Sequence, residues 1–189
     1  MHLSRRTFAL TFAFSLAFAT APAAAKELAG ATMPDTLTVA GKTLKLNGMG
    51  LRKKMGFKVY AGGLYLEAQS SDAKAILAAD APKALKMNFL RSVEKEKLVE
   101  VYKEGFEANA GPKAAAQKAG LDKFYATVTD VKEGSVTTYT YAPGTGTVVN
   151  RDGKDVATIE GKEFAEVLFS LWLGPKPPSE DLQKGLLGR

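Results

Sequence analysis

The sequence predicts an α+β fold in which helices lie on one face of a large antiparallel sheet. Apolar residues alternate at period two over residues 37–46 and 136–159, and a helical period of apolar residues appears between these segments. Short glycine turns join the predicted strands, which favours antiparallel pairing. No internal repeat and no long linker divides residues 26–189, so we expect a single domain there.

The first predicted strands form hairpins. Residues 37–46 alternate on either side of Ala40-Gly41, a pair typical of a tight turn. A short basic strand over residues 49–54 comes next, and residues 57–67 form a long strand rich in aromatic and branched side chains. Gly62-Gly63 in the middle of this long strand indicates a bulge or a close approach by another backbone segment.

Helices and one further strand occupy the centre of the chain. Ser71 is the expected cap of a short helix over residues 72–79, and residues 84–90 return to a strand pattern. Two helical segments are also expected over residues 113–119 and 121–125. Before them comes a longer helix, on which five residues share one face: Leu98, Val101, Tyr102, Gly105 and Phe106.

A three-stranded meander over residues 136–141, 147–150 and 154–159 completes the predicted sheet, with turns at Gly144-Thr145-Gly146 and at Asp152-Gly153.

Two helices are expected to end the chain. Gly174-Pro175 stops the first helix, and Ser179 caps the second. We interpret Ser170 as a polar helix residue, because no histidine is available to activate it. The apolar face of the first helix contains Phe164, Val167, Leu168, Leu171 and Trp172.

Residues 1–25 are predicted to be an export signal. Arg5 and Arg6 precede an apolar stretch shorter than the roughly 20 residues of a membrane-spanning helix, and Ala23-Ala24-Ala25 offers a cleavage pattern. Both the twin-arginine and the general secretory route fit this segment. We therefore expect a periplasmic protein of residues 26–189 without stable membrane insertion. The net charge of +6 on the 189-residue chain is spread along it, and gives no reason to expect a nucleic-acid partner.

The chain has no cysteine, and its only histidine, His2, lies in the predicted signal. A histidine-based triad and a metal site with imidazole or thiolate ligands are therefore excluded from the predicted mature protein. We expect no metal and no cofactor. Gly48, Gly50 and Gly56 do not have the spacing of a nucleotide-binding loop, and they lead into a strand instead of a helix.

Arg52 is the candidate site residue that the pattern leaves open. It either points to solvent together with Lys53 and Lys54, or it faces the apolar side of the sheet, where a guanidinium would need an anion.

Two runs of residues resemble the chalcone isomerase family, and in particular its exported bacterial members. The first is Gly48-Met49-Gly50-Leu51-Arg52 followed by the strand Phe57 to Leu66, and the second is Ala157 to Lys162 followed by Leu171-Trp172-Leu173-Gly174-Pro175. The resemblance implies an open-faced β-sandwich, in which helices cover one face of a large antiparallel sheet and a ligand cleft lies between the two layers.

The resemblance also implies two alternative functions. In the non-catalytic relatives an arginine and a tyrosine, at the positions of Arg52 and Tyr60, hold the carboxylate of a fatty acid. The isomerases also use a tyrosine and an asparagine, but the corresponding segment, residues 94–102, contains no Tyr-x6-Asn pair. We therefore expect a monomeric protein that binds a fatty acid or a similar amphipathic carboxylate. The alternative is an intramolecular lyase of the chalcone isomerase type, or an enzyme that acts on another phenolic ligand, in which Arg52 would serve catalysis.

Overall fold

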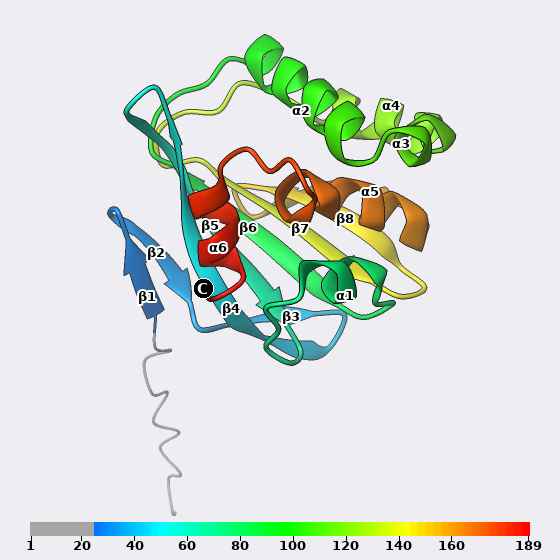
Figure 1. The fold of residues 1–189 in the computed structure, drawn as a ribbon, viewed down its shortest axis with the longest axis horizontal. Helices are drawn as coiled ribbons and strands as arrows, with labels where there is room; N and C mark the ends of the chain where they lie inside the picture. Colours follow the sequence, from blue (N-terminus) through cyan, green and yellow to red (C-terminus); the bar gives the residue numbers. More distant parts are fainter. Residues whose placement is uncertain (1–24) are drawn as a thin grey trace, which may run out of the picture.

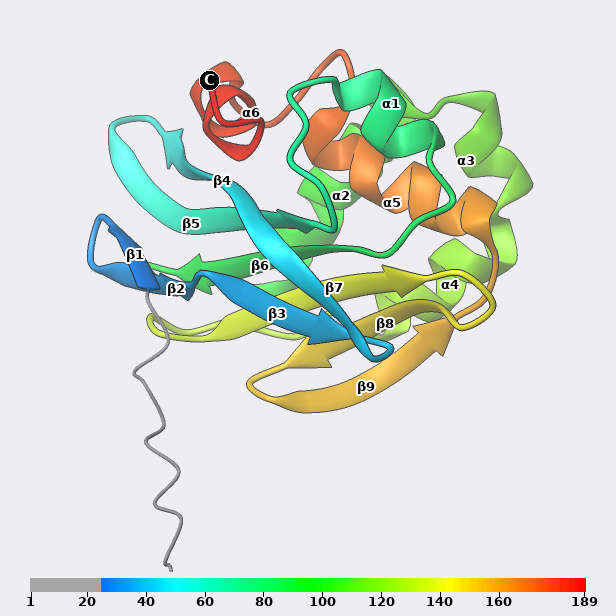
Figure 2. The same cartoon turned by 90° about the horizontal axis from the view of Figure 1, so that it is seen from below.

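The structure, a computed structural model, describes residues 25–189 and contains one large antiparallel sheet. Seven strands follow one another across this sheet in chain order, and the helices lie on one of its faces (Figure 1, Figure 2). This confirms the predicted α+β arrangement. The strands are β3 (Thr36–Val39), β4 (Lys42–Lys54), β5 (Phe57–Leu66), β6 (Lys83–Phe89), β7 (Val136–Ala142), β8 (Gly146–Arg151) and β9 (Lys154–Ile159).

The predicted export signal lies outside the described residues, except for Ala25, so the signal, its cleavage and the domain boundary stay predictions. Ala25 begins a hairpin that the sequence did not indicate, formed by β1 (Ala25–Leu28) and β2 (Ala31–Pro34). This hairpin packs on the face of the sheet opposite the helices, where Met33 is fully buried (Figure 2). The hydroxyl of Tyr65 donates a hydrogen bond of 2.9 Å to the carbonyl of Pro34 and so ties the hairpin to β5.

Two tight turns lie where the sequence predicted them. Both residues of Ala40-Gly41 and of Asp152-Gly153 have positive φ, as a two-residue type I′ turn requires. One boundary was wrong: residues 42–54 form a single strand, whereas the sequence pattern separated residues 49–54 from the strand before them. A register shift between Leu46 and Gly48 interrupts the period-two pattern there without ending the strand.

Six helices cover the sheet within the described residues. The predicted cap of the first is wrong, because Asp72, and not Ser71, accepts hydrogen bonds from the amides of Lys74 and Ala75. Ser179 caps the last helix, as predicted, through a bond of 3.3 Å from the Leu182 amide. The helices are α1 (Ala73–Ala78), α2 (Lys95–Asn109), α3 (Pro112–Ala116), α4 (Lys118–Ala126), α5 (Lys162–Leu173) and α6 (Glu180–Leu186).

Helix α5 is the centre of the helical layer. Its predicted apolar face is buried, and it contacts the sheet and lies between α1 and α2 (Figure 1). Ser170 donates its hydroxyl proton to the carbonyl of Val167 within the same helix, as expected for a polar residue in a buried helix. Gly174 ends α5, as the sequence predicted.

Glycines on β4 allow α6 to lie directly against the sheet. A Cβ at Gly48 would overlap the backbone oxygen of Gly185, and a Cβ at Gly50 would overlap that of Leu182. Gly48 and Gly50 are therefore packing residues, whereas Gly56 lies in the turn between β4 and β5, where φ is positive. Residues 174–179 connect α5 to α6, and two of them, Lys176 and Pro178, line a cavity between the sheet and the helices. The contact between α6 and β4 therefore also positions this connection.

We expect Gly50→Ala to lower the free energy of unfolding by about 1–3 kcal/mol, because the added methyl group must push α6 away from β4. Urea unfolding of residues 26–189 measures the change. The matched control is Gly62→Ala on β5, whose added Cβ would lie 3.4 Å from the Leu182 side chain, an ordinary contact. Equal losses in the two variants would contradict this account of the packing.

Candidate functional site

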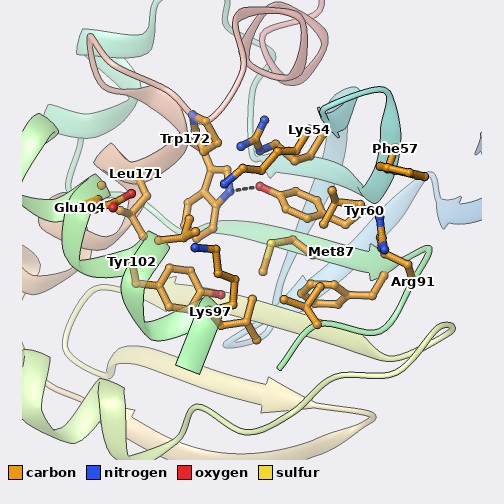
Figure 3. Close-up of a pocket in the computed structure, with 18 of the residues that line it drawn as sticks. Lys54, Phe57, Tyr60, Met87, Arg91, Lys97, Tyr102, Glu104, Leu171 and Trp172 are labelled. Atoms are coloured by element: carbon orange, nitrogen blue, oxygen red, sulfur yellow. Dashed lines mark hydrogen bonds between the residues drawn. The ribbon is translucent and has the colours of Figure 1, made fainter. Parts of the chain in front are cut away.

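A cleft of about 760 Å³ lies between the sheet and the helical layer. Strands β4, β5 and β6 form one wall, α2 forms the other, and the end of α5 closes the cleft at its inner side (Figure 3). The volume lies within the range of small-molecule sites, about 300–1,000 Å³. Most of the exposed lining is apolar, with side chains such as Met87, Phe89, Leu98 and Leu171.

Arg52 and Tyr60 both line this cleft and lie opposite one another on β4 and β5. At the turn, Lys54 pairs with Phe57 and Lys53 with Lys58, so an uninterrupted register would pair Arg52 with Val59. The register shift after Arg52 pairs it with Tyr60 instead. Because paired residues point to the same face of a sheet, this bulge brings the guanidinium and the phenol to the same side.

Arg52 is a half-buried residue, and its guanidinium donates a hydrogen bond to the neighbouring carbonyl of Lys53 on the exposed side. A guanidinium has five N–H donors, so this bond leaves others for a ligand. None of the ion pairs found within residues 25–189 includes Arg52. The residue therefore lies at the cleft with an uncompensated positive charge, in the second of the two orientations that the sequence left open.

The hydroxyl of Tyr60 is held by Trp172. The indole Nε1 of Trp172 lies 3.0 Å from the Tyr60 oxygen, and both side chains are buried (Figure 3). Since an indole can only donate, the Tyr60 oxygen accepts this bond and its own proton remains for another acceptor. The arrangement presents an O–H donor beside the Arg52 charge.

Burial keeps this tyrosine neutral. Desolvation raises the pKa of Tyr60 well above that of an exposed phenol, and the opposing effects of the Trp172 hydrogen bond and of the Arg52 charge are smaller. A neutral phenol donates a proton to an anion, whereas a phenolate would repel it. Arg52 and Tyr60 together therefore suit a negatively charged group.

A pair of tyrosines lies beside the cleft. The hydroxyls of Tyr102, on α2, and Tyr139, on β7, are 3.0 Å apart, and Tyr102 lines the cleft. Burial raises the pKa of Tyr139 to about 12 and that of Tyr102 well above its ordinary value, so both are neutral. Because each hydroxyl has the other as a hydrogen-bond partner, this pair lets two polar groups lie in an otherwise apolar interior.

The sequence identified part of this constellation. Arg52 and Tyr60 were predicted as site residues, and the fold brings them together. Trp172 and Tyr102 were assigned only to apolar helix faces, because a helical period indicates which face is buried and not what a polar atom on that face contacts. The one feature of the sequence that could have drawn attention to Trp172 is that it is the only tryptophan in the chain.

Residues 25–189 contain no group of three or more His, Asp or Glu side chains arranged to hold a metal ion. No helix among them is long and apolar enough to cross a membrane.

We expect the hydrogen bond between Trp172 and Tyr60 to be measurable in a double-mutant cycle. Urea unfolding of Tyr60→Phe, Trp172→Phe and the double variant should give a coupling free energy of about 1 kcal/mol, the usual contribution of such a bond. The control cycle pairs Tyr60→Phe with Tyr102→Phe, whose hydroxyl bonds Tyr139 and not Tyr60. Additive losses in the first cycle would show that the bond contributes nothing.

Comparison with known proteins identifies the family. No curated protein sequence matches the chain. Among solved structures, the crystal structure of a fatty-acid binding protein from Arabidopsis thaliana has the same fold, with a TM-score of 0.69 at 15% sequence identity, over 87% of this chain and 96% of that chain. This likeness confirms the predicted open-faced β-sandwich. The sequence profile described as chalcone isomerase-like matches residues 25–188, and the chain therefore belongs to the chalcone isomerase-like family.

Proposed function

We propose that this protein binds a fatty acid or a similar amphipathic carboxylate in the cleft between the sheet and α2. The observation that carries the proposal is the placement of Arg52 and Tyr60 on one face of the sheet at an apolar cleft. The name of the Arabidopsis structure, a fatty-acid binding protein, supports the same ligand class. The predicted export signal makes the periplasm the proposed location, and a monomer is the proposed state.

The head group is the part of the ligand that Arg52 and Tyr60 recognise. The guanidinium makes charge-assisted bonds to the carboxylate, worth roughly 1.5–3 kcal/mol, and the Tyr60 hydroxyl adds about 1 kcal/mol. Trp172 keeps the Tyr60 oxygen occupied as an acceptor, so the phenol meets the carboxylate as a donor. The result is a preference for an anion with two adjacent acceptor atoms.

The tail of the ligand lies along the apolar lining. Each methylene that is fully buried contributes about 0.8 kcal/mol, although ordering and association consume much of that sum. Since apolar burial has no direction, the tail sets the affinity and the head group sets the orientation.

The lyase alternative differs from binding in what happens to the ligand. Residues 94–102 end at Tyr102, and Asn109 follows it at the Tyr-x6-Asn spacing. Of these two residues only Tyr102 lines the cleft. The Asn109 amide donates to the carbonyls of Gly105 and Lys176, so the isomerases' asparagine is not available there. Purified protein should therefore leave the absorbance spectrum of an added chalcone unchanged. Conversion to the flavanone at a rate proportional to protein concentration would establish the lyase in place of the binding protein.

We expect Arg52→Ala to weaken the binding of palmitate roughly tenfold or somewhat more, and Tyr60→Phe to weaken it about fivefold. Arg52→Lys should recover only part of the loss, since an ammonium keeps the charge but lacks the two parallel donors. The fluorescence of Trp172, the only tryptophan, reports occupancy of the cleft during the titration.

Two controls distinguish a direct contact from general attraction. Arg91→Ala removes another cation that lines the same cleft but stacks on Phe57, so it should change palmitate affinity much less than Arg52→Ala. Methyl palmitate keeps the tail and loses the charge. Equal affinity for acid and ester, unaffected by Arg52→Ala, would refute the proposed head-group site.

A further inference from the structure

The turn between β4 and β5 carries the two most exposed large apolar side chains of the described residues. Within the described residues, three large hydrophobic side chains are strongly exposed: Met55 at 88%, Phe57 at 61% and Val156 at 47%. Met55 lies in this turn and Phe57 begins β5 directly after it, and the turn projects at the end of the two strands (Figure 1, Figure 2). We call residues 53–58 the hairpin tip.

Comparison with the other tight turns of the chain indicates that Met55 is not there for the turn itself. Among residues 25–189, four hairpins have a two-residue turn with positive φ at both positions and glycine at the second. The first residue is Ala29, Ala40 or Asp152 in three of them, and Met55 in the hairpin tip. A bulky residue is an uncommon choice in this backbone conformation, and its side chain contacts mainly water. The apolar group therefore suits a partner outside the chain.

The charge around the hairpin tip is positive. Lys53, Lys54 and Lys58 are all exposed, and residues 53–58 contain no acidic side chain. Arg91 adds a fourth cation, with its guanidinium 4.7 Å from the centre of the Phe57 ring (Figure 3). Glu100 on α2 is already paired with Lys97 at 2.5 Å, and this hydrogen bond, with a smaller effect of Lys54, lowers its pKa.

We propose that the hairpin tip docks on an anionic lipid surface, with Met55 and Phe57 entering the interface and the surrounding cations contacting the head groups. Apolar side chains surrounded by lysine and arginine are typical of interfacial membrane binding. A protein partner fits less well, because two side chains cannot supply the roughly 800 Å² per partner that a standard interface buries.

The position of the hairpin tip adds a consequence that rests on the proposed function. Lys54, Met55, Phe57 and Arg91 also line the cleft, so the tip forms its mouth. A docked protein would have this mouth against the lipid, and an amphipathic carboxylate could pass between membrane and cleft without crossing water.

Cosedimentation of the ligand-free protein, residues 26–189, with vesicles tests the docking. Binding is expected to vesicles of equal parts phosphatidylglycerol and phosphatidylcholine, and to be at least about tenfold weaker with phosphatidylcholine alone. The double variant Met55→Ser/Phe57→Ser should lose about tenfold or more in partitioning, because the apolar contribution is removed. Lys53→Gln/Lys58→Gln should lose about tenfold.

The β8–β9 hairpin supplies matched controls, since it has the same kind of turn and a polar tip. Val156→Ser removes the third exposed apolar side chain, and Lys154→Gln removes a lysine beside the Asp152-Gly153 turn. Both should bind vesicles like the unchanged protein. All variants are first compared by thermal unfolding, which should not change, because the substituted side chains are exposed.

Arg52→Ala separates the docking from the proposed fatty-acid site, because Arg52 lies outside the hairpin tip and its loss should leave vesicle binding intact. Absence of binding to the anionic vesicles, or equal binding by Met55→Ser/Phe57→Ser and the unchanged protein, would overturn the docking proposal. Vesicle binding that is lost equally in Val156→Ser would overturn it too, since the effect would not belong to the hairpin tip.

Discussion

The hydrogen bond from the Trp172 indole to the Tyr60 hydroxyl joins the helical layer to the sheet at the inner side of the cleft. Its direction is fixed, because the indole has only a proton to give. The Tyr60 proton is consequently available to a ligand, and the buried phenol stays neutral. The bond would have no such use without the bulge after Arg52, which brings the guanidinium to the same face of the sheet. The proposed head-group site thus depends on one hydrogen bond and one register shift.

The sequence was most informative where a residue's own conformation decides the structure. The Ala40-Gly41 and Asp152-Gly153 turns need positive φ, which glycine tolerates, and their hairpins were predicted. It was least informative where the partner is distant in the chain. Whether Gly50 serves a loop or a close contact depends on α6, about 130 residues away, and the polar contact of Trp172 depends on a strand 112 residues earlier. Arg52 was identified by family resemblance, since its orientation follows from the bulge and not from local pattern.

The two ends of the cleft have different chemistry. At the inner side the donors are held by the protein, through Trp172 and through the paired hydroxyls of Tyr102 and Tyr139. At the mouth the cations and the apolar side chains of the hairpin tip face solvent. A fixed, partly dehydrated cation selects an anion by geometry, whereas exposed cations attract any anionic surface and are sensitive to salt. Selection of the ligand and docking on a membrane would therefore be separable properties of one cleft.

The central claim is that a bound carboxylate lies against the Arg52 guanidinium, and the ionisation of that carboxylate tests it most directly. Palmitate labelled with ¹³C at the carboxyl carbon can be titrated with pH while bound, and its chemical shift followed by NMR. An adjacent cation favours the charged form, so the pKa of the bound carboxyl should be about one unit or more lower in the unchanged protein than in Arg52→Ala. The same midpoint in both proteins would contradict the account, because the carboxylate would then lie away from Arg52.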